Sequence, residues 1–452
     1  MLKFKEKLAY GFGDFASSMF WKIFGMYLLF FYTVVFDISP AIVGTMLLVT
    51  RIWDSVNDPI MGIVADRTST RWGKYRPYLL WGAIPFAIIG TLTFFVPDFS
   101  QGGKIAYAYI TYTLMMMVYT FVNVPYASLL GVMTPNVKTR NTLASYRMFM
   151  AYVGSFVTFM IFQPLIDGID GALTGTAPTG EISQNPTAWT LATMVIGITS
   201  AVFFFLCFKW TKERVKPIND QNGTIKEDLK ALAKNWPWWV LLVAGIAALL
   251  FNSIRDGVTL FYFADFVKDG YKVPMVGWSL GTLYLIIGQF CNMIGVAFAA
   301  PISNKIGKKN LYIIAMVIAA VLSIIFYGFE ADQYYMIFIF QALISMCAGI
   351  IFPLLWSMYA DIVDYQEKLT GRRMTGLIFS SSSMSQKMGW ALGGALTGWL
   401  LSIYGYDAGL AQQSEHTLSG IKLMMSIIPA ACCALAVVAM IIYPLSDKKI
   451  SK

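Results

Sequence analysis

Residues 51–59 read Arg-Ile-Trp-Asp-Ser-Val-Asn-Asp-Pro and lie inside a hydrophobic run from about residue 41 to residue 64. A run of this length can cross a bilayer, and ionisable groups at that depth usually face a cavity or an ion path because burying them is costly. Asp54 and Asp58 are four residues apart, so on a helix they share one face, with Arg51 and Asn57 beside them. Two neighbouring carboxylates destabilise each other's charge, which a bound cation or a proton would relieve. A simpler interpretation, that Arg51 only neutralises Asp54, leaves Asp58 unexplained.

The composition predicts a membrane protein. Of the 452 residues, 57% are hydrophobic and only 13% are charged, about half the charged fraction of an average soluble protein. Twelve apolar runs are long enough to span a bilayer, which predicts an all-α polytopic protein of twelve transmembrane helices in two six-helix bundles. The runs lie near residues 10–36, 41–65, 78–96, 105–132, 146–167, 188–208, 236–266, 276–301, 311–329, 334–360, 376–405 and 418–444.

A polar segment separates the two groups of runs. It predicts a cytoplasmic linker at 209–235 between an N-terminal bundle, 1–208, and a C-terminal bundle, 236–452. The loops 66–77 and 303–310 echo one another, since both are short, basic and contain glycine. Two related bundles of this kind suggest transport by rocking about a central site.

The basic residues predict the orientation. The outer loops would hold only Lys104, Lys268 and Lys272, and the cytoplasmic segments would hold most of the 34 Lys and Arg. By the positive-inside rule, both termini are expected to be cytoplasmic, in a multi-pass protein of a bacterial-type inner (plasma) membrane. The topology and the attraction of basic loops to anionic lipid explain the net charge of +9. We therefore expect the protein to lie in a lipid bilayer and not to bind nucleic acid.

Nothing in the sequence predicts catalysis. We find no nucleophile elbow, phosphate loop or metal-ligand cluster, and the single histidine, His416, lies in a polar loop. The five cysteines lie in apolar runs without ligand spacing. We therefore expect neither an enzyme nor a cofactor.

Four motifs resemble those of the glycoside–pentoside–hexuronide:cation symporters, the melibiose permease-like family of the major facilitator superfamily. They are Tyr-Gly-Phe-Gly-Asp at 10–14, the stretch 51–59, Arg-Trp-Gly-Lys-Tyr-Arg-Pro at 71–77 and Ala-Asp-Ile-Val-Asp-Tyr at 360–365. The resemblance runs from the first predicted helix to the twelfth. It implies the major facilitator fold and secondary active transport, in which a sugar or glycoside moves with a monovalent cation by alternating access.

The resemblance also implies a cation site. The family's ligand positions match Asp54, Asn57, Asp58 and Thr120 in this chain. Hard cations favour carboxylate and carbonyl oxygens, although a buried carboxylate pair could instead share one proton. We predict sodium as the coupling ion because the amide and hydroxyl ligands are kept, and a proton needs no such cage. A proton remains the alternative.

The matching substrate positions depart from those of the family's galactoside carriers. Those carriers place aspartates where this chain has Ser18 and Asn123, and tryptophans where it has Ala127 and Phe352, so a different sugar is expected. The predicted substrate-binding residues are Ser18, Lys22, Tyr119, Asn123, Arg147, Phe352, Ser383 and Lys387.

Several charged positions have two interpretations. Arg147 and Lys387 match cavity positions and could bind sugar oxygens and offset Asp54 and Asp58, or could only join a structural ion-pair network. Lys22 could bind the carboxylate of a uronide, or could pair with Asp54 or Asp14. Arg255, in the seventh predicted helix, could likewise either bind substrate or have a structural role.

Two alternatives to sugar symport were weighed. A lipid or drug carrier on the same fold would need a wide apolar cavity, whereas this chain places several charges inside its spans. A membrane sensor would need an appended soluble domain, for which the predicted tails are too short. The family resemblance further implies that a monomer suffices.

Overall fold

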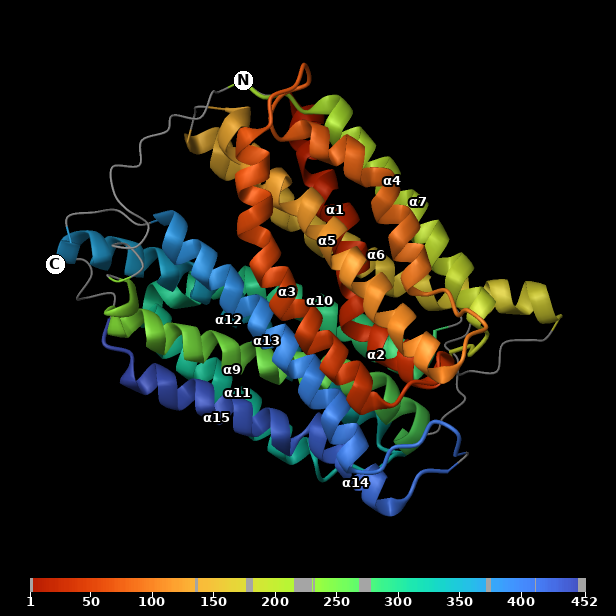
Figure 1. Ribbon diagram of the computed structural model, residues 1–452. Helices are drawn as coiled ribbons and strands as arrows, with labels where there is room; N and C mark the ends of the chain where they lie inside the picture. The colour runs from red at the N-terminus through yellow and green to blue at the C-terminus, as the bar shows by residue number, and fades with distance from the viewer. Residues whose placement is uncertain are drawn as a thin grey trace. The chain divides into compact units, whose positions relative to one another are not determined.

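The structure is a computed structural model that describes residues 3–134, 137–175, 182–214, 230, 232–267, 278–370, 375–410 and 412–445. These residues are helical almost throughout (Figure 1). The helices up to residue 210 are α1 (Phe4–Met26), α2 (Leu28–Phe30), the π-helical η1 (Phe31–Val35), α3 (Pro40–Arg67), α4 (Arg76–Thr93), α5 (Gln101–Met133), α6 (Val137–Thr174) and α7 (Pro186–Trp210). The later helices are α9 (Trp236–Phe261), the π-helical η2 (Tyr262–Val267), α10 (Leu280–Ile306), α11 (Lys308–Phe326), α12 (Tyr334–Thr370), α13 (Thr375–Ile403), α14 (Glu415–Met425) and α15 (Ile427–Ile442).

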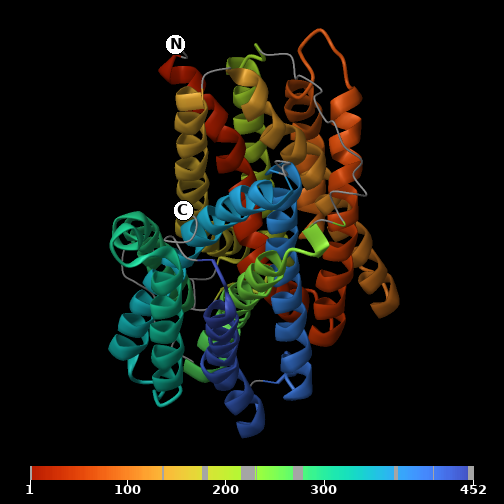
Figure 2. The same cartoon turned by 90° about the vertical axis from the view of Figure 1, so that its left-hand side faces the viewer.

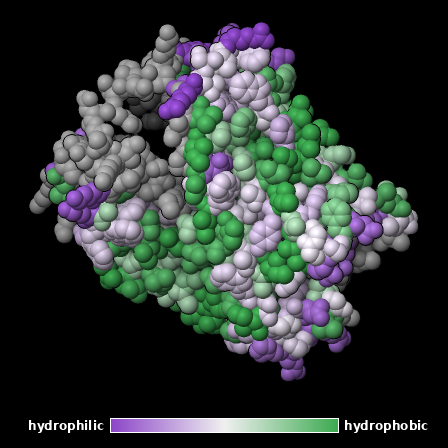
Figure 3. All heavy atoms as spheres, in the orientation of Figure 1, coloured by the Kyte–Doolittle hydropathy of each residue, from purple (hydrophilic) through white to green (hydrophobic). Residues whose placement is uncertain are grey.

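The predicted fold class is confirmed, because helices make up most of every predicted span within the part of the chain that the structure describes. Within the described residues, eight helices are long and apolar enough to cross a membrane, or nine if α1 and the bent α2–η1 segment form one span. The helix α3 is not among them, since it carries the charges that the sequence analysis placed inside an apolar run. Hydrophobic side chains gather along the helices of the face in Figure 3, and hydrophilic ones lie near the helix ends.

The chain divides into two compact units. The first is Met1–Asn219 with Asp269–Thr282, and the second is Asp220–Lys268 with Leu283–Lys452. In the first unit, α1 packs on α6 and α7, α4 packs on α5 and α7, and α3 packs on α5. In the second unit, α9 packs on α13 and α15, and α11 packs on α12 and α15. The pairs that α1 and α4 form with α6, α7 and α5 thus correspond to those that α9 and α11 form with α13, α15 and α12. Figure 1 labels these helices, and Figure 2 shows the same ribbon turned by 90°.

Two local features occur at corresponding places in the first and second units. The first long helix of each unit leads into a π-helical segment, η1 or η2. A cation near the start of α4 or α11 also caps the carboxyl end of the last helix of its unit: Arg76 donates to Phe208 O at 2.6 Å, and Lys309 donates to Ile441 O and Tyr443 O at 3.0 and 2.6 Å. Helix ends leave such carbonyls without intrahelical partners, and cations there are favourable.

The loop at residues 71–77 has a specific structural role. Glu213 accepts hydrogen bonds from the backbone N–H groups of Lys74, Tyr75 and Arg76 at 2.8, 2.8 and 2.9 Å, at the amino end of α4. Gly73 has a φ of 116°, and a Cβ there would lie 2.6 Å from Glu213 Cδ. A side chain other than hydrogen is therefore excluded on both conformational and steric grounds.

The residues after α7 belong to the first unit. Arg214 donates to both carboxylate oxygens of Glu6 at 2.5 and 2.9 Å, and its backbone N–H donates to Val132 O at 2.8 Å. The segment 211–214 falls inside the predicted linker, 209–235, yet it is held on the bundle by these contacts. The domain boundaries at 208 and 236 stay a prediction.

Candidate functional site

The predicted cation ligands come together where α3 packs on α5. Thr120 Oγ1 lies 2.6 Å from Asp54 Oδ1 and 3.0 Å from Asp58 Oδ1. Asp54 and Thr120 are each 1% exposed, Asn57 is 7% exposed one turn along α3, and Asp58 is half-buried. A hydroxyl has one proton to donate, so it can hydrogen-bond only one of two ionised carboxylates at a time. The group of oxygens therefore favours a further positive charge, either a proton or a cation.

Arg51 is the nearest basic side chain on the same helix, but its ion pair with Asp54 is loose. The distance from Nη1 to Asp54 Oδ2 is 3.9 Å, which is beyond hydrogen-bond range. Arg51 is 6% exposed, and its Cζ lies 4.4 Å from the centre of the Trp21 ring. Simple neutralisation of Asp54 by Arg51 is thus a poor description of this site.

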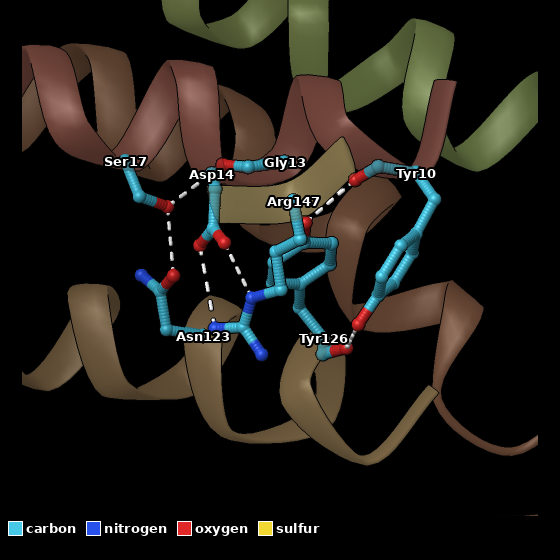
Figure 4. Close-up of polar contacts among 7 residues, drawn as sticks. All are labelled: Tyr10, Gly13, Asp14, Ser17, Asn123, Tyr126 and Arg147. Carbon is cyan, nitrogen blue, oxygen red and sulfur yellow. Dashed lines mark hydrogen bonds and ion pairs between the residues drawn. The ribbon is translucent and has the colours of Figure 1, made fainter. Parts of the chain in front are cut away.

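A second polar group joins α1, α5 and α6, and sequence reasoning missed its acidic member (Figure 4). Asp14, which is 9% exposed, accepts hydrogen bonds from Arg147 Nε and, at 3.3 Å, from Arg147 Nη2. The guanidinium also lies 5.0 Å from the centre of the Tyr126 ring. Arg147 was predicted either to bind sugar oxygens and offset the α3 carboxylates or to join a structural ion-pair network, and within the described residues it forms an ion pair with Asp14. The signal was available, because Asp14 is an ionisable residue inside the first apolar run.

The serine that contacts Asn123 is Ser17, the neighbour of Ser18, whose predicted role in substrate binding stays a prediction. Ser17 Oγ donates to Asn123 Oδ1 at 2.7 Å (Figure 4), and Asn123 Nδ2 donates to Tyr119 O at 2.9 Å. Ser18 is half-buried and lies one residue further round α1. Successive residues on a helix point about 100° apart, so a match of positions along the chain could not decide which hydroxyl faces α5.

The motif at residues 10–14 is explained by close packing. A Cβ on Gly13 would overlap the Tyr126 ring, and one on Gly11 would lie 2.6 Å from Met150 Cγ. Tyr126 Oη donates to the Tyr10 carbonyl at 2.6 Å across the same contact (Figure 4). Because α1 approaches α5 and α6 this closely, Asp14 can reach Arg147.

The remaining predicted residues of the first unit lie near aromatic rings. The Tyr119 ring centre is 5.5 Å from that of Trp21. Lys22 is half-buried, with Nζ 5.7 Å from the centre of the Phe159 ring.

The predicted residues of the second unit are Phe352 on α12 and Lys387 on α13, both half-buried, and Ser383, whose side chain falls outside the described residues. Arg255 has a structural environment: it donates to Tyr284 Oη at 2.6 Å, to Gln341 Oε1 at 2.9 Å and to the carbonyl of Met425. Met425 ends α14, where a break before α15 frees its carbonyl. The structural interpretation of Arg255 is therefore favoured.

The comparisons with known proteins decide the family. The model of the family described as "MFS/sugar transport protein" matches residues 9–447. This chain belongs to that family. The predicted recognition as a sugar transporter of the major facilitator superfamily is confirmed, and the proteins of this family are transporters.

Curated relatives match along nearly their whole length. YagG of Escherichia coli (strain K12), which carries the provisional name of glycoside/cation symporter, is 36% identical over 99% of this chain and 94% of its own. The isoprimeverose transporter of Lactiplantibacillus pentosus is 35% identical over 98% and 89%. The glucuronide carrier protein homolog of E. coli (strain K12) is 31% identical over 99% and 94%.

A solved structure shares the fold. A bacterial homologue of the human lysosomal transporter Spinster matches with a TM-score of 0.69 at 13% identity, over 97% of this chain and 95% of that one.

Proposed function

We propose that this protein is a symporter that couples the uptake of a sugar or glycoside to sodium by alternating access. The observation that carries the proposal is the position of Thr120, whose single hydroxyl lies against both Asp54 and Asp58 in a buried site. Two carboxylates, one hydroxyl and the neighbouring amide of Asn57 are the oxygen ligands that a hard cation prefers.

The types of side chain at the site favour sodium over a proton. A proton shared by Asp54 and Asp58 would balance the charge equally well, but it would give no role to Asn57. The buried amide on the same helix, one turn from Asp54, is accounted for if it supplies an oxygen to a cation.

The substrate side is supported by the polar group of α1, α5 and α6. Arg147 and Asn123 present donors and acceptors of the kind that bind sugar hydroxyls, and the names of relatives include carriers of isoprimeverose and glucuronides. Lys22 would bind the carboxylate if the substrate is a uronide. The charges buried among these helices argue against the alternative, a lipid or drug carrier.

The proposed setting is a bacterial-type inner membrane, with both termini cytoplasmic and the monomer as the transporting unit. The basic loops 66–77 and 303–310 would then face anionic lipid on the cytoplasmic side. A relative of 34% identity over 97% of this chain is named an inner membrane symporter, which supports the location.

Uptake into proteoliposomes tests the proposal. Neutral and uronate-bearing mono- and disaccharides are supplied with a sodium gradient, a proton gradient or none. We expect one sugar to accumulate with the sodium gradient, and Asp58→Asn to abolish that accumulation. Asp98→Asn, the same chemical change in an exposed loop of the same unit, should behave like wild type. Accumulation of no sugar under either gradient would favour the lipid or drug carrier.

A further inference from the structure

Arg51 and Asp54 form an unusual pair for two buried side chains one turn apart. In a low dielectric, opposite charges this close are expected to form direct hydrogen bonds, because their attraction is screened little. Instead the shortest separation is 3.9 Å, and Arg51 Nη1 makes no hydrogen bond with any described residue.

The Arg51 guanidinium instead contacts the ring of Trp21. This ring on α1 lies 4.4 Å from Arg51 Cζ, which is the distance of a cation–π contact, and a guanidinium also stacks on aromatic faces. Trp21 is in turn packed against Tyr119, the residue next to Thr120 on α5. The aromatic residue is thus fixed to the helix that supplies the hydroxyl ligand.

We propose that Trp21 is a positioning residue of the cation site, resting on the proposed function. By stacking on Arg51, Trp21 keeps the guanidinium out of hydrogen-bond contact with Asp54. Arg51 then does not hydrogen-bond to the carboxylate oxygens of Asp54 that would bind sodium. Without the ring, Arg51 would turn to Asp54 and act as an internal counter-ion that sodium has to displace.

Sodium binding can be measured without knowing the sugar. A ligand that binds only the folded state stabilises it by RT ln(1 + c/Kd), where c is the free ligand concentration, so the rise in unfolding temperature across a concentration series gives the Kd. The purified protein is therefore unfolded thermally in sodium chloride series, with choline chloride holding the ionic strength constant. We expect Trp21→Leu to raise the apparent Kd of sodium about five- to thirtyfold, the range of a desolvated cation–π contact. Trp81→Leu, a 44% exposed tryptophan on α4, is the matched control and should leave the Kd unchanged.

A double-mutant cycle separates this role from packing. In an Arg51→Gln background the Arg51 counter-ion is removed, so adding Trp21→Leu should change the sodium Kd less than twofold. An equal loss of affinity in both backgrounds would overturn the proposal, as would an unchanged Kd for Trp21→Leu alone.

Incorporation of tetrafluorotryptophan at position 21 covers the case in which Arg51→Gln fails to fold. The fluorinated ring keeps its shape and loses the negative face, so sodium affinity should still fall; unchanged affinity would overturn the proposal. Asp58→Asn is measured in parallel. If sodium stabilises wild type but not Asp58→Asn, and Trp21→Leu matches wild type, only the role of Trp21 fails. If sodium does not stabilise wild type, the sodium assignment and the role of Trp21 fail together.

Discussion

Thr120→Val is the sharpest perturbation of the cation site, because valine has nearly the shape of threonine and lacks the hydroxyl. The substitution removes the oxygen that lies 2.6 Å from Asp54 and 3.0 Å from Asp58. A hydrogen bond to a charged group contributes about 1.5–3 kcal/mol. If the hydroxyl oxygen also ligates sodium, its loss should raise the sodium Kd about tenfold to a hundredfold.

The assay is the sodium-dependent unfolding temperature, followed by sodium-driven uptake of the sugar found in the screen. Thr120→Ser keeps the hydroxyl and should retain most of the affinity. Thr199→Val removes a hydroxyl on α7 that bonds only its own helix, at Val195 O, 2.8 Å away. A sodium Kd for Thr120→Val within twofold of both wild type and Thr199→Val would refute the assignment of Thr120 as a ligand.

Three further substitutions test other contacts within the first unit. Asp14→Asn removes the charge that pairs with the half-buried Arg147 guanidinium and should lower the free energy of unfolding by about 1.5–3 kcal/mol, measured by thermal unfolding. Glu213→Gln weakens three hydrogen bonds at the start of α4 and should cost about 1.5–3 kcal/mol, with the largest loss of amide protection at residues 74–76. Gly13→Ala drives a methyl into the Tyr126 ring and should cost about 1–3 kcal/mol, whereas Gly131→Ala, which meets nothing within 4 Å, should not destabilise.

The fold was predictable because the bilayer imposes it. Apolar runs of spanning length must be helical to satisfy their backbone hydrogen bonds, and α5, α7 and α9 appear where the runs lie. The grouping of Thr120 with Asp54 and Asp58 was suggested by resemblance alone, since helical spacing could place only the two aspartates on one face. That these residues bind sodium stays a prediction.

What the sequence did not predict depends on contacts between distant segments. Asp14 and Arg147 are 133 residues apart, and only the packing of α1 on α6 shows that they pair. The choice between Ser17 and Ser18 depends on the rotation of α1 about its axis, which one sequence does not specify. Glu213 lies just after a helix end among other polar residues, so nothing local marks it as the partner of three backbone amides.

The contacts of Figure 4 also limit which parts of the first unit can move independently. The Asp14–Arg147 ion pair, the Tyr126–Tyr10 hydrogen bond and the close approach at Gly13 join α1, α5 and α6. Breaking this set during each turnover would cost several buried interactions at once, so the three helices should travel as one rigid body. Any hinge inside the first unit is then expected at α3. Because α3 supplies the carboxylates of the proposed cation site, a bound cation would restrict the movement of α3 and its release would permit it.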